Sequence, residues 1–384
     1  MNSHAKSISP KLRKVRRHLH AHPELSGEEH KTSSYIADYL KKNTNAKIVY
    51  PLGKTGVLAT FNGKKKGKTV MIRGDIDALP ITEVNTFKHR SKQKGVSHMC
   101  GHDGHATILL GLAELLTSNP PTRGKIHLLF QPAEEDGRGA AAVLKDKKFN
   151  RLKIDFVFAL HNLPGYPINQ VVIRRNSFTA NVKSLIVKFY GKTAHAAEPE
   201  HGANPALAIA ELLQGAEEIT KNRPEKADFF LITPIHTNMG DLSYGISAGY
   251  GEVHLTIRSW SPKIMKEKCD LLIRQIHKRA KTRGLEAKTS WTQVFEANIN
   301  SDEAVDFIEN AAHRNGLEVK ERQYPFKWGE DFGLSTQKYK GAMFGVGAGE
   351  DCPALHNPDY DFPDKITSTC ISMFYSIAKE AIRS

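Results

Sequence analysis

Short apolar runs alternate with stretches of helical periodicity along most of the chain. The runs lead into Gly, Asp, Glu or His, and they lie at residues 57–61, 69–72, 126–130, 154–160 and 342–346. Apolar residues at helical spacing cover residues 106–116 and 140–146. Strands that alternate with helices in this way are typical of a sheet covered on both faces. The pattern therefore predicts an α/β domain with a mixed sheet and helices on both of its faces.

The N-terminal segment predicts two helices. Leu12, Val15 and Leu19 are at helical spacing, the pattern breaks at Pro23, and a second helix is expected over residues 27–42.

Three histidines, His18, His20 and His22, alternate in the first of these helices. Alternate positions on a helix lie roughly 200° apart, so the three imidazoles cannot converge on one ion. Only His18 and His22 share a face, and we expect these histidines to pack rather than to bind a metal.

Between residues 181 and 295 the order of elements changes to β-α-β-β-α-β. The expected elements are residues 182–190, 205–221, 229–236, 249–259, 262–283 and 285–295. This order predicts a ferredoxin-like domain inserted into the chain. Helices at residues 303–315 and 365–382, with the strand at 342–346 between them, then resume the first pattern. We therefore expect a discontinuous catalytic domain (1–178 and 297–384) around an inserted lid and dimerisation domain (179–296).

Composition places the chain among ordinary globular proteins: 384 residues, 40% hydrophobic and 25% charged. No apolar run approaches the ~18–20 residues that a membrane span needs, and no apolar region follows the charged N-terminus. We expect a cytoplasmic protein without a membrane partner. The 4 cysteines include no CxxC pair, which argues against a disulfide framework or a structural zinc knuckle.

The formal charge of +14 would fit a nucleic-acid partner if the basic residues lay on one element with aromatic residues between them. Instead they are spread over residues 11–17, 64–68, 88–94 and scattered helix positions. We interpret the excess as solvated surface, with attraction of anionic small molecules as the alternative, and expect no nucleic-acid partner.

Candidate metal ligands follow the predicted strands. Ligand sites in open α/β sheets lie beyond the carboxyl ends of the strands. The polar side chains at these ends are Asp75, Asp77, Glu134, Glu135, His161 and His356. Cys100 and His102 lie just before a predicted helix, beside glycines that permit a tight backbone. Thiolate, imidazole and carboxylate donors at one edge are the ligand set of Zn, Mn, Co or Ni. His105 is expected to cap the following helix rather than to bind metal.

The adjacent pair Glu134 and Glu135 indicates hydrolysis. Neighbouring side chains in an extended or turn segment point in different directions, so one carboxylate can bind a metal while the other faces the cleft. A carboxylate beside a metal can take a proton from an activated water and deliver it to a leaving amine. Asp77 is a candidate to orient a histidine ligand. The alternative interpretation is two solvated glutamates in a loop.

Two residues of the inserted domain are further candidates. His195 lies among small residues between a strand and a helix, where its imidazole would be accessible. It could donate a hydrogen bond to a developing oxyanion, and Arg258 at a strand end could bind a substrate carboxylate. The alternatives are a loop imidazole and a surface ion pair.

The chain resembles the aminoacylase/carboxypeptidase family of two-metal hydrolases, in the branch of hippurate hydrolases, auxin-amide hydrolases and N-acyl-amino-acid deacetylases. The motifs that carry this resemblance are Pro23-Glu24-Leu25, Gly74-Asp75-Ile76-Asp77, Met99-Cys100-Gly101-His102-Asp103, Gln131-Pro132-Ala133-Glu134-Glu135, Ala159-Leu160-His161, Ala194-His195-Ala196-Ala197, Gly329-Glu330-Asp331-Phe332 and Leu355-His356-Asn357-Pro358.

The resemblance implies that two divalent ions, Mn or Zn with Ni or Co as alternatives, are held by Cys100, His102, Glu135, His161 and His356. Cys100 then stands where most of the wider family has a bridging aspartate.

Further roles implied by the resemblance concern Glu134, His195 and the assembly. Glu134 matches the general base, and His195 matches a lid histidine that completes the partner subunit's site, which implies a homodimer joined through the inserted domain. Two segments depart from the family pattern: Gly245 stands where an asparagine is usual, and Glu200 lies in a stretch that differs from the common Pro-His.

We therefore expect a metal-dependent amidohydrolase that cleaves the amide bond of small N-acyl amino acids. A dipeptidase or carboxypeptidase of the same family is the alternative within this class. The alternative from another class is a basic, metal-stabilised binding protein without turnover.

Overall fold

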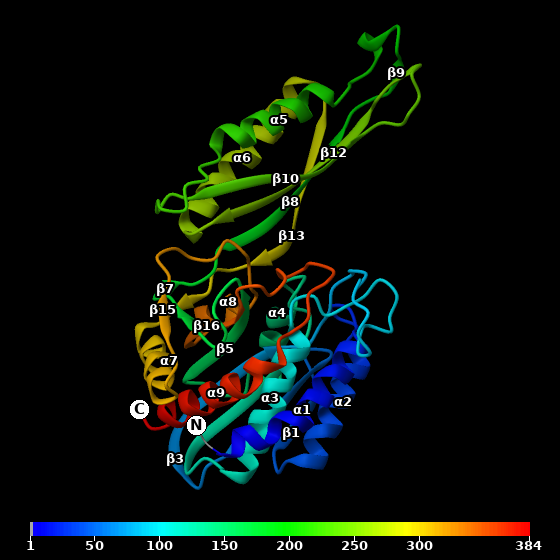
Figure 1. Ribbon diagram of the computed structural model, residues 1–384. Helices are drawn as coiled ribbons and strands as arrows, with labels where there is room; N and C mark the ends of the chain where they lie inside the picture. Colours follow the sequence, from blue (N-terminus) through cyan, green and yellow to red (C-terminus); the bar gives the residue numbers. More distant parts are fainter. Residues whose placement is uncertain (1–2) are drawn as a thin grey trace. The chain divides into compact units, whose positions relative to one another are not determined.

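The computed structural model describes residues 3–384, with side chains from Pro10 onward, as two compact units. The first unit comprises the chain up to Phe178 together with Asn298–Gln323 and Glu330–Ser384. The second comprises Thr179–Ala297 and Tyr324–Gly329 (Figure 1). The short segment at 324–329 thus belongs to the inserted unit, although the sequence pattern assigns it to the surrounding part of the chain.

The first unit is built on an eight-stranded mixed sheet with the order β1-β2-β4-β3-β5-β16-β6-β15. The strands are β1 (Lys47–Leu52), β2 (Gly56–Asn62), β3 (Lys65–Asp75), β4 (Arg123–Gln131), β5 (Phe156–Pro164), β6 (Val171–Ile173), β15 (Val319–Glu321) and β16 (Lys340–Gly349). β3 is parallel to β4 and β5, and β16 is parallel to β5, whereas β1, β2 and β6 add antiparallel pairs. The mixed sheet of the sequence prediction is confirmed.

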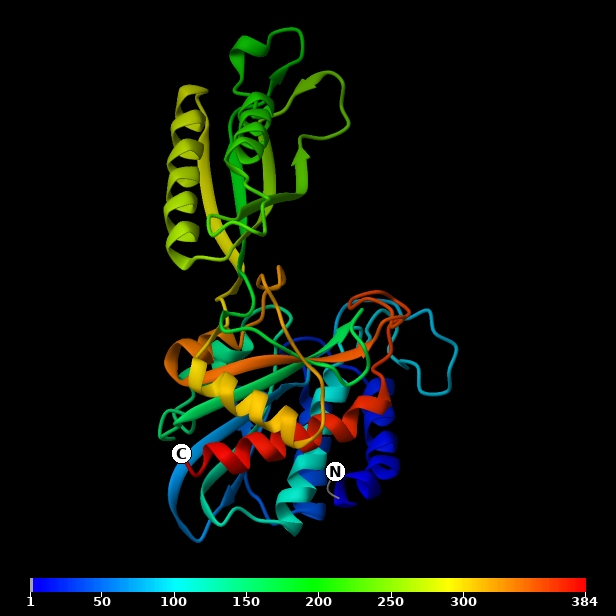
Figure 2. The same cartoon turned by 60° about the vertical axis from the view of Figure 1, so that its left-hand side comes forward.

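Helices cover both faces of this sheet (Figure 2). They are α1 (Ser3–Ala21), α2 (His30–Asn43), α3 (His102–Ser118), α4 (Gly139–Lys145), α7 (Asp302–Arg314), α8 (Gly333–Lys338) and α9 (Thr367–Ala381). α3 packs between α1 and α9, and α7 packs on α9, whereas α4 and α8 pack together. α3 is apolar and buried nearly all round, as expected of a helix in the middle of a core.

The N-terminal helices separate the three alternating histidines as expected. The rings of His18 and His22 lie 4.5 Å apart, and His18 stacks on Tyr35. His20 is buried and contacts carboxylates instead. α2 begins at His30, three residues later than the predicted start.

The second unit is a four-stranded antiparallel sheet with the order β10-β12-β8-β13. Its elements are β8 (Asn181–Tyr190), α5 (Ala206–Ile219), β10 (Phe230–Met239), β12 (Tyr250–Ser259), α6 (Pro262–Thr282) and β13 (Glu286–Phe295). The ferredoxin-like order expected from the sequence is therefore present. α5 and α6 bury one sheet face, with Leu185, Val253 and Leu255 in the core. A short ribbon, β9 (Ala194–His195) with β11 (Ile246–Ser247), joins two loops of this unit.

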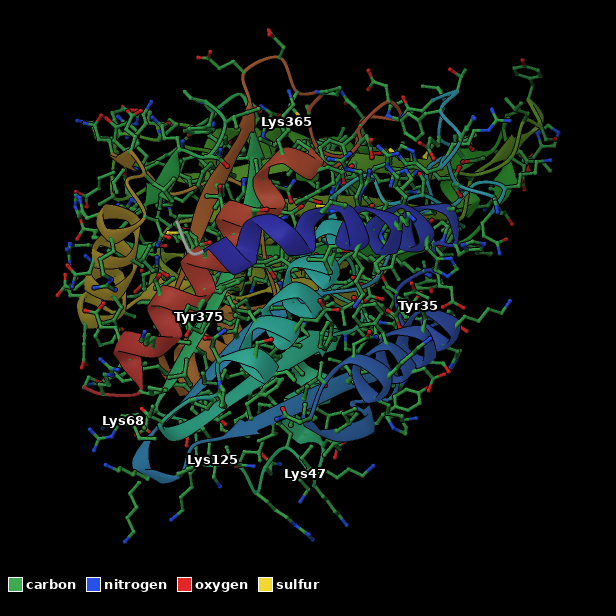
Figure 3. All side chains as sticks on the ribbon, turned by 60° about the horizontal axis from the view of Figure 1, so that its bottom comes forward. Tyr35, Lys47, Lys68, Lys125, Lys365 and Tyr375 are labelled. Atoms are coloured by element: carbon green, nitrogen blue, oxygen red, sulfur yellow. The ribbon has the colours of Figure 1, made fainter. Side chains whose placement is uncertain are left out.

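Within residues 3–384 no helix is long and apolar enough to cross a membrane. Basic side chains project from the strands of the large sheet, among them Lys47, Lys68 and Lys125 (Figure 3). Lys47 and Lys125 are exposed, and Lys68 lies 3.5 Å from a carboxylate oxygen of Asp155.

A substitution at Gly104, in the first turn of α3, tests how tightly the core of the first unit is packed. A Cβ added there would lie 2.3 Å from Cδ2 of Phe362. We expect Gly104→Ala to lower the free energy of unfolding by about 1–3 kcal/mol through overpacking, measured by denaturant unfolding. The matched control is Gly245→Ala, where the added Cβ meets no atom within 4 Å. Equal stabilities of the two variants would contradict this packing.

Candidate metal centre

The predicted donors of the first unit are brought to one edge of the large sheet. β3 ends at Asp75, β4 ends at Gln131, and His161 lies near the end of β5. Cys100 and His102 flank Gly101 at the start of α3, where Gly101 has φ 94°. A Cβ at Gly101 would lie 2.7 Å from Oδ1 of Asn162, so glycine is required for this turn.

Cys100, His102 and His161 form the first group of donors. The Sγ atom of Cys100 lies 3.5 Å from Nε2 of His161. The ligand atoms of the three residues all lie within 4.8 Å of one another, and all three residues are buried. This spacing suits side chains that share a metal ion.

Glu135 links this group to His356. Its Oε1 lies 3.7 Å from Nε2 of His102, and its Oε2 lies 3.5 Å from Nε2 of His356. Cys100, Glu135 and His356 also have ligand atoms within 4.8 Å of one another. All five residues that the sequence analysis named as ligands therefore converge. His356 has φ 66°, a conformation uncommon for a residue with a side chain, and its N–H donates to the carbonyl of Met99.

Hydrogen bonds fix the orientation of two of the imidazoles. Nδ1 of His102 lies 3.1 Å from Oδ1 of Asp77 and 3.0 Å from its carbonyl oxygen. Nδ1 of His161 lies 2.9 Å from the carbonyl oxygen of Asn162. Because these partners are oxygen acceptors, the proton lies on Nδ1 of each ring and Nε2 faces the other donors.

Asp77 also holds the backbone of the glutamate pair. Its Oδ2 accepts hydrogen bonds from Oγ of Ser26 and from the N–H of Glu135. Burial alone would raise the pKa of Asp77, but its contacts with His102 and Glu135 outweigh this effect and lower it. One carboxylate thus orients both a histidine and a glutamate of the cluster.

Two atoms at the centre of the cluster have no hydrogen-bond partner among the described residues. They are Nε2 of His102 and Oε1 of Glu135, and both are buried. Buried polar atoms without a partner are costly. Burial also raises the pKa of Cys100, and it raises the pKa of Glu135 to about 8. A cation between these groups would satisfy the open atoms and stabilise the ionised thiolate and carboxylate, so the donor set fits divalent metal.

Glu134 is buried, and one of its carboxylate oxygens lies within 4.8 Å of ligand atoms of His102 and Glu135. A carboxylate oxygen of Glu134 lies within 4.8 Å of carboxylate oxygens of Glu330 and Asp331. Its Oε1 accepts a long hydrogen bond, 3.4 Å, from the N–H of Asp331. Burial and the charges of Glu330 and Glu135 raise the pKa of Glu134 well above its usual range. The structure thus gives the adjacent glutamates different surroundings.

Arg73 compensates the carboxylates around Glu134. Its guanidinium is buried and donates to Asp75 at 2.6 Å, to Glu330 at 2.8 Å and to Asp331 at 2.8 Å. Arg73 lies in β3. A single arginine in an apolar strand has no sequence pattern that marks it, so its contacts with these carboxylates were not predicted. Its position two residues before Asp75, on the same side of the strand, was the available clue.

His105 is engaged by neighbours on both ring nitrogens. Nδ1 lies 2.5 Å from Oδ1 of Asp75, and Nε2 lies 2.6 Å from Oδ1 of Asn162. Sequence reasoning expected a helix cap here, whereas the side chain ties α3 to β3 and β5.

A second buried charge network lies beneath the same turn. His20 contacts Asp103 at 2.9 Å and Glu83 at 3.2 Å, and Arg16 donates to Asp103 at 3.2 Å. Although burial lowers the pKa of His20, its contacts with Asp103 and Glu83 raise it to about 9. These ion pairs fasten α1 to the residue that follows His102.

His195 and Arg258, the remaining candidates, belong to the second unit. His195 is exposed, and its Nδ1 accepts a hydrogen bond of 3.1 Å from the N–H of Ala197. Nη1 of Arg258 donates to the carbonyl of Lys327 at 2.6 Å.

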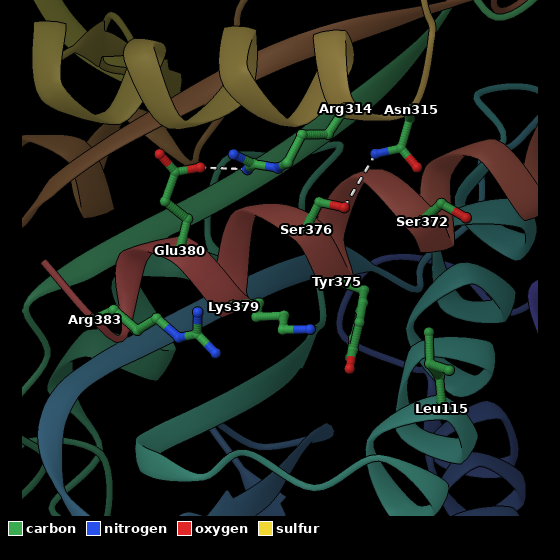
Figure 4. Close-up of a pocket in the computed structure, with 9 residues that line it drawn as sticks. All are labelled: Leu115, Arg314, Asn315, Ser372, Tyr375, Ser376, Lys379, Glu380 and Arg383. Atoms are coloured by element: carbon green, nitrogen blue, oxygen red, sulfur yellow. Dashed lines mark hydrogen bonds and ion pairs between the residues drawn. The ribbon is translucent and has the colours of Figure 1, made fainter. Parts of the chain in front are cut away.

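A cavity of about 400 Å³ in the first unit contains none of the named donors (Figure 4). It is lined by Leu115, Arg314, Asn315, Ser372, Tyr375, Ser376, Lys379, Glu380 and Arg383. Glu380 pairs with Arg314 at its edge. The chemistry therefore lies at the sheet edge and not in this cavity.

An α/β sheet with such a donor cluster and an inserted ferredoxin-like unit defines a metallohydrolase. Residues 71–380 match the family described as Peptidase family M20/M25/M40. The chain is 31% identical to N-acetyl-L-cysteine deacetylase of Bacillus subtilis, with 98% of this chain and 90% of the relative covered. It is 28% identical to hippurate hydrolase of Campylobacter jejuni, with 98% of each covered.

A solved structure from Bacillus subtilis, described as a dinuclear metal binding peptidase of the M20 family, has a similar fold. The TM-score is 0.83 at 26% identity, with 98% of this chain and 99% of that chain covered. The chain belongs to peptidase family M20/M25/M40 and is a hydrolase of amide bonds. The family resemblance inferred from the sequence motifs is confirmed.

Replacing Arg73 tests the electrostatic account of the site. Arg73→Met leaves Asp75, Glu330 and Asp331 buried without their cation. We expect a loss of about 3–5 kcal/mol in the free energy of unfolding, because breaking a buried ion pair strands the remaining charge. The control is Arg123→Met, an exposed arginine of the neighbouring strand β4. A loss no larger than that of the control in urea unfolding would contradict the account.

Proposed function

We propose that this chain is a metal-dependent amidohydrolase that cleaves the amide bond of small N-acyl amino acids. The observation that carries the proposal is the position of the adjacent glutamates at the donor cluster: Glu135 shares a donor group with Cys100 and His356, whereas Glu134 lies between His102 and Glu135 on one side and the pair Glu330 and Asp331 on the other. The named relatives, a deacetylase of N-acetyl-L-cysteine and a hippurate hydrolase, support this substrate class.

In this proposal Cys100, His102, Glu135, His161 and His356 hold two divalent ions, Mn or Zn, with Ni or Co as alternatives. The mixed donor set supports borderline transition metals over Mg or Ca, which prefer oxygen ligands. Metals bound there supply a Lewis acid for the carbonyl and lower the pKa of water. Asp77 keeps Nε2 of His102 aimed at the centre.

Glu134 is the proposed general base. Its carboxylate takes a proton from the attacking water and delivers it to the leaving nitrogen. The N–H of Asp331 holds Oε1 of Glu134. Arg73, bound to Asp331 and Glu330, fixes these neighbours around the base.

Two residues of the second unit complete the proposal. The imidazole of His195 donates to the oxyanion of the tetrahedral intermediate, and its exposure leaves Nε2 accessible to a substrate. Arg258 binds the substrate carboxylate with guanidinium N–H groups other than the one donated to Lys327.

The proposed assembly is a homodimer joined through the second unit, with His195 serving the partner subunit's site. The loop beside His195 supports it: Leu242 is 97% exposed and Tyr244 is 96% exposed. Ile235 is also exposed on β10, which is an edge strand of its sheet. Apolar side chains gathered on a surface mark an interface.

Replacing Glu134 tests its role in proton transfer. We expect Glu134→Gln to lower kcat on the order of 10²–10⁴-fold, because the amide cannot take up the proton. The metal content, measured by mass spectrometry of the purified protein, should equal that of wild type. Wild-type turnover by this variant would contradict the role.

The substrate class is tested with acetyl-, benzoyl-, succinyl- and indoleacetyl-amino acids alongside dipeptides, using purified protein with Mn. We expect hydrolysis of acyl-amino acids that is lost after dialysis against a chelator and restored by Mn or Zn. Faster cleavage of dipeptides would favour the dipeptidase alternative. Salt-sensitive binding of nucleic acid without hydrolysis would favour the binding protein.

The assembly is tested by light scattering after size exclusion. We expect Leu242→Asp with Tyr244→Asp to shift the wild-type dimer towards monomer, because two charges would have to be buried in the interface. The control is Ile168→Asp, an exposed apolar residue of the first unit. A wild-type monomer, or a dimer unchanged by both variants, would contradict the proposed interface.

A further inference from the structure

Three metal-binding side chains gather on the open face of the sheet in the second unit, away from α5 and α6. His236 on β10 is directly opposite His254 on β12 in the antiparallel register. Glu252 precedes His254 by two residues in β12, where buried and partly exposed residues alternate. Residues two apart share a sheet face, and opposite residues are close neighbours. The register therefore places His236, His254 and Glu252 on one patch.

Both imidazoles approach the same carboxylate oxygen. Nε2 of His236 lies 3.8 Å from Oε1 of Glu252, and Nε2 of His254 lies 3.7 Å from that atom. The two rings are 5.2 Å apart between centroids and nearly perpendicular. The separations are too long for hydrogen bonds, so both imidazoles face Oε1 of Glu252 without bonding to it.

The other oxygen of Glu252 is already occupied. The hydroxyl of Tyr250 donates to Oε2 at 2.6 Å, and Nζ of Lys188 lies 3.8 Å from Oε2. This arrangement leaves Oε1 for a further ligand and fixes its direction, as hydrogen-bonded neighbours do for metal-binding carboxylates. The hydrogen bond from Tyr250, with the charges of His254 and Lys188, lowers the pKa of Glu252 and keeps it ionised.

Nε2 of His254 is a second, independent sign of a missing ligand. This atom is buried, and it has no hydrogen-bond partner within the described part of the chain. The carboxylate of Glu252, 3.7 Å away, is too far from Nε2 of His254 to form a hydrogen bond with it. A metal ion beside Oε1 of Glu252 would satisfy Nε2 of His254 and take His236 as a further ligand.

We propose that Nε2 of His236, Nε2 of His254 and Oε1 of Glu252 bind one divalent transition-metal ion of the Zn type. Two imidazoles and one carboxylate form a ligand set that zinc accepts, with a fourth position left to water. Zinc lies about 2.0–2.2 Å from such ligands, so the donors must move together slightly. The side chain of His236 is 52% exposed and lies on the edge strand β10. The bound ion links β10 to β12.

This site is separate from the candidate metal centre and does not rest on the proposed function. Its nitrogen donors exclude a preference for Mg or Ca, which favour all-oxygen sites. The proposed site binds one ion per chain in addition to any ions at the candidate metal centre of the first unit.

The experiment counts zinc in the full-length protein. Wild type and variants are stripped with chelator, dialysed against buffered Zn²⁺, and assayed for zinc per chain by mass spectrometry. We expect His254→Ala and Glu252→Gln each to bind one ion fewer than wild type, with unchanged hydrolytic activity. The matched control is His277→Ala, an exposed histidine on α6 of the same unit, which should keep the wild-type zinc content.

Equal zinc in wild type and both site variants would overturn the proposal. So would an equal loss in the His277→Ala control, which would indicate adventitious binding to surface histidines. The Glu252→Gln variant keeps the size of the side chain, so it carries the test if His254→Ala fails to fold. A candidate metal centre that binds no zinc would lower the zinc content of wild type and all variants alike and leave the difference of one ion intact.

Discussion

Five carboxylates, Asp75, Asp77, Glu134, Glu330 and Asp331, are buried at one edge of the large sheet. Burying so much negative charge is unfavourable unless cations compensate it. Arg73 contacts three of the five, and the imidazole of His102 lies beside Asp75 and Asp77. The buried atoms without a partner, Nε2 of His102 and Oε1 of Glu135, mark the place where a further cation would fit. The need to compensate these carboxylates thus explains both the position of Arg73 and the fit of the donor cluster to divalent metal.

The sequence allowed the donor cluster to be predicted because its members follow strands whose carboxyl ends meet at one sheet edge. Cys100, His102, Glu135, His161 and His356 converge although they come from four separate parts of the chain. The helices and the long strands were also predictable, since they bury apolar residues with clear periodicity. β1 was missed because most of its residues are exposed or half-buried, so its pattern carries little signal.

The contacts that hold the donor cluster in place could not be predicted from the sequence, for a physical reason. Arg73 is far in the sequence from the adjacent pair Glu330 and Asp331, and only tertiary packing brings their charges together. A single arginine in an apolar strand has no periodic or spacing signature. The same holds for His105, whose contacts with Asp75 and Asn162 come from two different strands. Sequence reasoning found the donors that converge, and the structure adds the residues that hold them in place.

X-ray diffraction from crystals grown with Mn or Zn, with anomalous scattering recorded at the metal edge, tests the central claim most directly. The account predicts two anomalous peaks among the five donors, with Sγ of Cys100 and Nε2 of His102 within bonding distance. An empty cluster, or a Cys100 thiol turned away from the imidazoles in the presence of metal, would contradict it.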